Sequence, residues 1–196
     1  MMTEHKPVPP SAKKIAKALT KHGHTRTDHY YWLNDRKDPQ VIKYLEAENA
    51  YTEAMMKHTE MFQQKLYDEI VGRIKKDDES VPYKKNGYWY YTRFEKGGEY
   101  PIYCRKKESL EAQEEVLLNV NIMAEGHEYY NATGLNVSTN NKLMAFAVDT
   151  VGRRKYTLYV KNLETGQILD MSIANTTGSS TWANDNKTLY YTRKDE

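Results

Sequence analysis

The chain has 196 residues, of which 39% are hydrophobic and 29% are charged, and its formal net charge at neutral pH is +2. The 29 basic and 27 acidic residues are interspersed, which excludes the single-sign basic footprint of a nucleic-acid-binding protein. No run of 18 apolar residues occurs, so no membrane-spanning helix is predicted. The length allows one good domain, or one domain with part of another.

The N-terminal stretch 1–14 lacks the apolar region of a signal peptide, and we therefore expect a cytoplasmic protein. The single cysteine, Cys104, excludes an internal disulfide and a Cys-based zinc site, and its strand context predicts a small buried side chain. His22, His24 and His29 lie close together in sequence, but their spacing matches no ligand pair on a helix turn. We interpret them as loop histidines rather than as a metal site, and we expect no cofactor.

The first part of the chain is predicted to be helical. Residues 13–21 could form a short helix that Gly23 would end. Asp38 and Pro39 are typical of a helix start, and the apolar stripe that follows predicts a helix through about residue 58. Apolar residues then recur at four-residue intervals over 62–74, which predicts a second helix. Both stripes are interpreted as surfaces that face a core.

After Asp78 the hydrophobic pattern alternates, which is typical of strands. The clearest case is 87–106, where two runs rich in aromatic residues flank Gly97 and Gly98, and we predict a β-hairpin there. Asn162 to Gly166 has the composition of a second hairpin turn. The strands that this pattern predicts are 81–83, 87–95, 99–106, 115–118, 127–138, 142–149, 155–162 and 167–171.

The β-rich part is internally repetitive. Tyr90-Tyr91-Thr92-Arg93 recurs as Tyr190-Tyr191-Thr192-Arg193, with a related segment at 142–147, and 100–105 resembles 156–161. A unit of about 45–55 residues holding four strands is typical of a propeller blade. Two blades fit between about 79 and 172, and a third has begun where the sequence stops. A propeller needs at least about four blades to close, so we expect the chain to be the front of a longer protein. A two-sheet sandwich with accidental similarity is the alternative.

The sequence contains little catalytic chemistry. It has no Gly-x-Ser-x-Gly nucleophile turn, and we interpret Gly178-Ser179-Ser180-Thr181 as a polar loop. Neither a phosphate-binding glycine loop, nor a His-Glu-x-x-His pair, nor a calcium loop occurs. No catalytic, cofactor-binding or metal-binding residue is therefore predicted within the chain.

Six segments of the sequence stand out together: 28–33, 38–39, 44–49, 87–91, 100–105 and 149–158. In this order they resemble motifs of the prolyl oligopeptidase family of serine peptidases, and in particular of its oligopeptidase B branch. The resemblance runs in register from about residue 7 to the last residue. One departure is 138–141, Ser-Thr-Asn-Asn, where propeller repeats often have Ser-Pro-Asp-Gly.

The resemblance implies a mixed fold class: an N-terminal α-helical arm, followed by the first blades of a seven-bladed β-propeller. Residues 1–77 would be an arm that belongs to an α/β-hydrolase domain, and residues 78–196 would form two blades and the start of a third. The parent enzyme would hydrolyse short peptides after Arg or Lys by a Ser-His-Asp triad. The triad would lie outside this chain, which by itself would be inactive.

The same resemblance implies the partners and the role of this segment. It would gate substrate access and support the hydrolase domain, and the loop Asn175 to Ser179 could face the cavity between the domains. The expected partners are short peptides and the remainder of the same polypeptide, and the isolated arm could self-associate through its apolar surface. The alternatives are a prolyl-specific oligopeptidase of the same family and a non-catalytic propeller that binds a partner.

Overall fold

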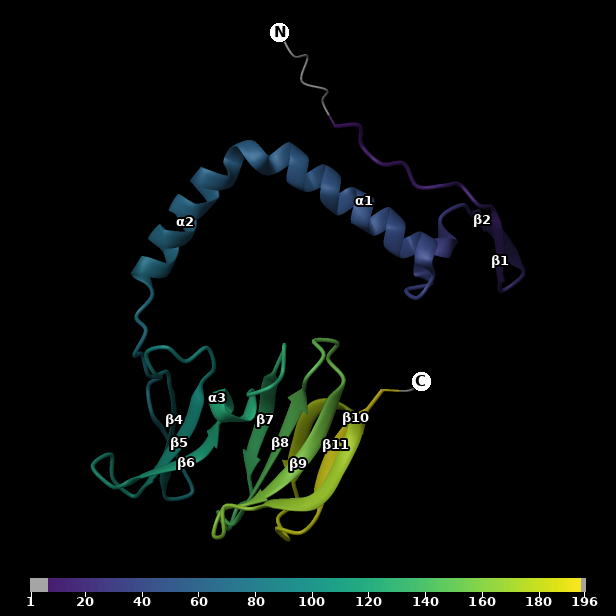
Figure 1. Cartoon of the computed structure of the whole chain (residues 1–196). Helices are drawn as coiled ribbons and strands as arrows, with labels where there is room; N and C mark the ends of the chain where they lie inside the picture. The colour runs from purple at the N-terminus through teal and green to yellow at the C-terminus, as the bar shows by residue number, and fades with distance from the viewer. Residues whose placement is uncertain (1–6, 195–196) are drawn as a thin grey trace. The chain divides into compact units, whose positions relative to one another are not determined.

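The computed structural model describes residues 7–194, so part of the N-terminal stretch 1–14 lies outside the described residues. The chain divides into two compact units, one ending at Ile74 and the other beginning at Lys75. The first holds a small hairpin and two helices, and the second holds two antiparallel sheets (Figure 1). Among the described helices, none is both long and apolar enough to cross a membrane.

The first unit begins with a β-hairpin, and the short helix predicted over 13–21 is wrong. Strands β1 (Lys17–Lys21) and β2 (His24–Asp28) pair antiparallel and are joined by a two-residue turn. His22 and Gly23 have φ values of 52° and 77°, and a turn with two positive φ angles matches the twist of a hairpin. An isolated helix of this length is marginal in water, whereas the hairpin pairs every residue of the strand.

The two predicted longer helices are both present. A 3₁₀ turn, η1 (Tyr31–Asn34), precedes α1 (Pro39–Met56), and a second one, η2 (Lys57–Thr59), joins α1 to α2 (Glu60–Arg73). The Asp38 carboxylate caps α1 by accepting a hydrogen bond of 2.8 Å from the backbone N–H of Gln40. The start of α1 is therefore encoded locally, as the sequence predicts.

The apolar stripes of these helices are not covered within their own unit. Val41 is the one buried residue of α1, and α2 buries none. The large apolar side chains that remain exposed on the two helices and just after them are Ile42, Leu45, Met55, Met56, Met61, Phe62, Leu66, Tyr67, Ile70 and Ile74. The prediction that the stripes face a core is thus not met by the first unit alone.

The first sheet of the second unit contains the predicted hairpin. Its strands are β3 (Tyr83–Lys85), β4 (Tyr88–Arg93), β5 (Ile102–Lys107) and β6 (Glu114–Asn119), paired antiparallel in that order. The hairpin expected at 87–106 corresponds to β4 and β5 and is confirmed. A short helix, α3 (Val120–Met123), follows and was not predicted.

The second sheet has five strands because one of them is longer than the sequence predicts. The strands β7 (Asn131–Val137), β8 (Leu143–Asp149), β9 (Tyr156–Asn162), β10 (Ile168–Trp182) and β11 (Leu189–Arg193) lie side by side in this order. The strand expected at 167–171 continues to Trp182. Its first half pairs with β9 and its second half with β11, and both pairings meet at Thr176. The last strand of the second repeat and the first of the third are therefore one continuous strand.

The repeated segments occupy equivalent places in the two sheets. The repeat Tyr90–Arg93 lies in β4, and its counterparts lie in β8 and β11, each joined by a hairpin to the strand before it. The second pair of related segments forms β5 and β9, which both come third in their repeats. The sequence repeat is thus a repeat of strand position.

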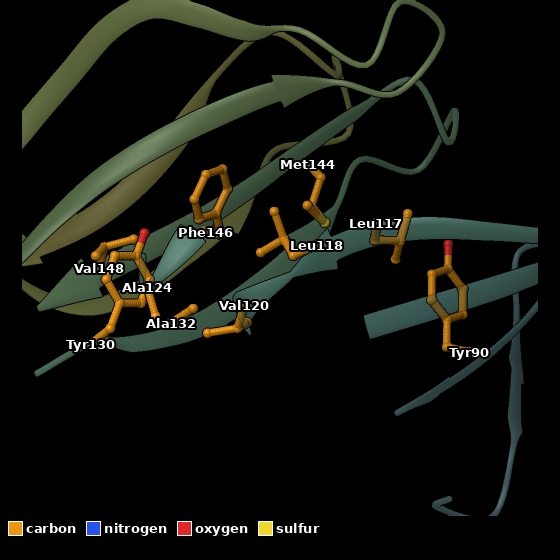
Figure 2. Close-up of a cluster of buried hydrophobic side chains, with 10 residues drawn as sticks. All are labelled: Tyr90, Leu117, Leu118, Val120, Ala124, Tyr130, Ala132, Met144, Phe146 and Val148. Carbon is orange, nitrogen blue, oxygen red and sulfur yellow. The ribbon is translucent and has the colours of Figure 1, made fainter. Parts of the chain in front are cut away.

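One apolar cluster joins the two sheets of the second unit. Figure 2 shows these side chains in a row that runs from Tyr90 in the first sheet to Tyr130 beside the second. Phe146 and Met144 of β8 are fully buried, and Leu117 and Leu118 of β6 pack against them. The full set is Tyr90, Leu117, Leu118, Val120, Ala124, Tyr130, Ala132, Met144, Phe146 and Val148. This shared core fixes the first two repeats against each other.

Candidate functional site

A cavity of about 400 Å³ lies between the two sheets of the second unit. Tyr83, Tyr91 and Tyr103 line one part of it, and Gly134 and Met144 line the other. Aromatic and small residues of this kind suit an apolar or aromatic side chain better than a charged one. The cavity is a candidate binding site, and one of its lining residues, Tyr91, also belongs to a half-buried polar network.

The polar network is built on Glu114 of β6. The Arg93 guanidinium donates to both carboxylate oxygens of Glu114, with an Nη2 to Oε1 distance of 3.0 Å and an Nε to Oε2 distance of 3.1 Å. The Tyr91 hydroxyl donates to the same carboxylate at 2.5 Å, and Arg93 also pairs with Glu95. Each member of this network therefore has a charged or hydrogen-bonded partner.

The pKa shifts in the network favour an ionised Glu114 and a neutral Tyr91 at neutral pH. The hydrogen bonds from Arg93 lower the pKa of Glu114, and the bond from Tyr91 lowers it further. Burial and the hydrogen bond to Glu114 raise the pKa of the Tyr91 hydroxyl. The site thus holds an ionised carboxylate, a guanidinium cation and a neutral phenol. These hydrogen bonds connect β4, which carries Tyr91 and Arg93, to β6, which carries Glu114.

Cys104 is buried beside this network, as its strand context predicts. It is 1% exposed, and burial, followed by the charge of Glu114, raises the pKa of its thiol to about 12. A thiol that stays protonated is a poor nucleophile and a poor metal ligand. Cys104 therefore acts as a small apolar side chain in the first sheet.

We predict that replacing Glu114 by Gln reduces the loss of stability in acid. A lowered folded-state pKa gives stability that is present above the ordinary Glu pKa of about 4.3 and is lost as the pH falls through the folded value. Glu114→Gln should lower the free energy of unfolding at pH 7 by about 1–3 kcal/mol, because hydrogen bonds to a charged group are lost. It should also flatten the stability profile below pH 4. Urea unfolding between pH 2.5 and 7 measures both effects.

The matched control is Glu95→Gln, which removes another carboxylate from the same Arg93. The Glu95 side chain is 56% exposed against 28% for Glu114, so its removal should change stability by less than about 1 kcal/mol. Equal pH profiles for the two variants would show that Glu114 has no special role.

The motif at Asp149 shapes the loop between β8 and β9. Its buried carboxylate accepts hydrogen bonds from the backbone N–H groups of Val151, Gly152 and Arg154, at 2.9, 3.0 and 2.7 Å. Burial alone would raise the pKa of Asp149, but the backbone N–H groups outweigh it and lower the pKa. Its contacts in the structure are therefore those of a loop-forming residue.

The segment Asn175 to Ser179 lies inside β10 and is not a separate loop. Asn175 and Gly178 have φ values of 60° and 91°, which mark an irregularity in the strand where its pairing changes. Thr176 is buried, and its hydroxyl donates to the carbonyl of Tyr156 at 3.1 Å. The polar stretch Gly178–Thr181 likewise belongs to the strand. The expectation that this segment faces a cavity between domains stays a prediction.

The structure places the three histidines in the first hairpin and directly after it. His22 occupies the turn between β1 and β2, His24 begins β2, and His29 follows it. Within residues 7–194, no group of three or more His, Cys, Asp or Glu side chains could hold a metal ion.

Sequence reasoning missed the Arg93–Glu114 network and the burial of Arg105. Arg105 is 3% exposed, pairs with Glu115 at 2.8 Å and lies 4.0 Å from the centre of the Tyr88 ring. Both arginines fall inside motifs that the sequence singles out, the Tyr-Tyr-Thr-Arg repeat and the 100–105 segment. The position of Arg93 at the end of the aromatic repeat was the one sign in the sequence that it has a structural role. The sequence does not say which acidic residue of a neighbouring strand it pairs with.

A family model described as "Prolyl oligopeptidase, N-terminal beta-propeller domain" matches residues 9–196. Dipeptidyl aminopeptidase BI of Pseudoxanthomonas mexicana is 44% identical over 95% of this chain and 28% of its own length. Protease 2 of Moraxella lacunata is 34% identical, again over 95% of this chain and 28% of its own. This chain therefore spans less than a third of the length of these relatives.

A solved structure has the same fold. Oligopeptidase B from Leishmania major superposes with a TM-score of 0.87 and 32% sequence identity, and the alignment covers 96% of this chain and 29% of that one. The aligned part includes both the helices and the sheets, because almost the whole chain is covered. The resemblance that the motifs suggest is confirmed.

Proposed function

Because the chain belongs to the prolyl oligopeptidase family, we propose that it forms the N-terminal part of a serine oligopeptidase that hydrolyses short peptides after Arg or Lys. The observation that carries the proposal is the likeness to oligopeptidase B of Leishmania major over 96% of the chain. The identity of 34% to Protease 2 supports the same branch of the family. The catalytic triad would come from the part of the enzyme outside this chain.

In this proposal the first unit is an arm of the hydrolase domain, with the boundary near residue 77. The support is the exposed apolar surface of α1 and α2, which a folded protein rarely leaves open over such a length. Phe62 and Ile70, for example, are both 60% exposed. The arm would bury these side chains against the hydrolase domain and so hold the two domains together.

The second unit would supply two propeller blades and the beginning of a third, within a propeller of seven. Its contribution to the reaction would be to limit access, because a covered active site admits only short, flexible peptides. The shared core around Phe146 keeps the first two blades rigid enough for that role. The chemical step itself would be nucleophilic attack by a serine that a histidine activates, with water hydrolysing the acyl-enzyme.

The proposal is tested with the complete enzyme on chromogenic peptides that carry Arg, Lys or Pro at the cleaved position and a blocked N-terminus. We expect cleavage after Arg and Lys to exceed cleavage after Pro by at least about 100-fold, because a site built to pair with a charged side chain discriminates strongly against an uncharged one. Preference for Pro would favour the sister enzyme of the family. An absence of hydrolysis on all substrates would favour a non-catalytic binding propeller.

A second candidate is a peptidase that removes dipeptides from free N-termini. The observation that favours it is the 44% identity to a protein named dipeptidyl aminopeptidase BI, which exceeds the identity to Protease 2. Chromogenic dipeptides, each prepared once with a free N-terminus and once with a blocked one, separate the two activities. An enzyme that requires the free amine is an aminopeptidase, whereas one that accepts the blocked peptide is an oligopeptidase.

A further inference from the structure

The first hairpin of each repeat turns on an asparagine with a left-handed backbone. Asn86 joins β3 to β4, Asn141 joins β7 to β8, and Asn186 joins β10 to β11. Their φ values are 47°, 63° and 57°, a region that asparagine tolerates better than most residues. The same residue therefore occupies the same turn in three successive repeats.

The side chains of the second and third of these asparagines bind the turn of the repeat before them. The Asn141 side-chain N–H donates to the carbonyl of Asn86 at 2.9 Å. The Asn186 side-chain oxygen accepts from the Thr139 hydroxyl at 2.8 Å and from the Asn140 backbone N–H at 2.9 Å. In both cases the asparagine side chain of one repeat is hydrogen-bonded to the turn of the preceding repeat. The three turns are therefore connected one after another along one edge of the two sheets.

Other contacts hold the first of these junctions in place. The Arg105 guanidinium donates to the carbonyl of Asn141 at 3.3 Å, and the Tyr90 hydroxyl reaches the Asn141 side-chain oxygen at 3.4 Å. Arg105 is itself buried and ion-paired. The asparagine turn is thus a point where two blades are fastened and not an isolated surface loop.

Asn86 has the same turn but no predecessor in the chain. Asn86 is exposed, whereas Asn141 and Asn186 are half-buried. The Asn86 side chain has no hydrogen-bond partner among residues 7–194. We propose that Asn86 binds the first hairpin turn of the last blade and so fastens the seam where the propeller ring closes. This inference rests on the proposed function, which supplies the remaining blades. The partner would be the backbone carbonyl, or the N–H and hydroxyl pair, of that turn.

The chain itself enters the second unit at the opposite end of the first sheet. Glu79 bridges to Arg93, at the end of β4 that lies farthest from Asn86 along the strand. The Asn86 turn therefore lies at the other end of β4 from the point where the chain enters the unit.

The test is Asn86→Gly in the complete enzyme, followed by hydrogen exchange. Glycine keeps the positive φ and removes only the side-chain amide. We expect backbone exchange in the first turn of the last blade to rise about fivefold, the effect of losing one net hydrogen bond. Asn141→Gly is the control, and it should raise exchange at residues 85–87 while leaving the last blade unchanged.

Unchanged exchange in the last blade of Asn86→Gly, with a measurable effect of Asn141→Gly, would overturn the inference. An equal rise for both variants would also overturn it, because the effect would then be a general loosening. Failure of the proposed function shows separately, in the unmodified enzyme, as an absence of hydrolysis after Arg or Lys.

Discussion

Replacing Gly134 by alanine should destabilise the second unit by about 2–5 kcal/mol. Gly134 of β7 has a φ of +65°, and a Cβ atom there would lie 1.9 Å from the carbonyl oxygen of Gly178 in β10. The left-handed backbone costs about 1–2 kcal/mol for a residue with a side chain, and overpacking adds about 1–3 kcal/mol. The clash is with backbone, so no side chain can rotate away. Urea unfolding, with the free energy extrapolated to water, measures the loss.

The matched control for this prediction is Gly126→Ala. Gly126 has a φ of +80°, but a Cβ atom there would meet nothing within 4 Å. It should therefore show only the backbone cost, about 1–2 kcal/mol. If both variants lose the same stability, the close approach of β7 to β10 does not exist in solution.

The second large effect is expected for Phe146→Ala. Phe146 is 0% exposed at the centre of the cluster that joins the two sheets, and its ring stacks on Tyr159 with centroids 5.6 Å apart. Truncation of a buried phenylalanine costs about 3–5 kcal/mol, because transfer energy is lost and a cavity remains. Since domains are stable by only about 5–15 kcal/mol, we expect a large drop in the thermal midpoint of the second unit.

Phe94→Ala is the control in the same unit. Phe94 follows β4 and is 41% exposed, so the same change in chemistry should cost no more than about 1 kcal/mol. Thermal unfolding followed by near-ultraviolet circular dichroism compares the two variants. A similar loss at both positions would mean that the cluster around Phe146 is not the core of the unit.

The parts of the fold that the sequence predicts well are those with local causes. The Asp38–Pro39 pair starts α1 because the cap and the fixed φ of proline act within one turn of helix. The hairpin β4–β5 follows from its aromatic strands and a turn at Gly97, whose φ is 89°. The strand repeat was visible because each blade repeats the same strand environment.

The errors have a different origin. The segment around Ile15 and Leu19 reads as a short helix only if the His22–Gly23 turn is ignored. The length of β10 depends on pairing with two different strands, and neither pairing is visible in its own residues. The Asn141 link to Asn86 joins positions 55 apart in sequence, and only the fold brings them together. Secondary-structure propensity and hydrophobic periodicity carry no information about nonlocal contacts of this kind.

The continuity of β10 has a consequence for how the molecule would come apart. Its residues Ile168 to Thr176 serve the second repeat, and those from Thr176 to Trp182 serve the third. Because β10 belongs to both repeats, pulling the third repeat away would also pull on the edge strand of the second. Mechanical or thermal unfolding of one repeat would therefore spread directly to its neighbour. The boundary between these repeats is therefore a point of cooperativity and not a hinge.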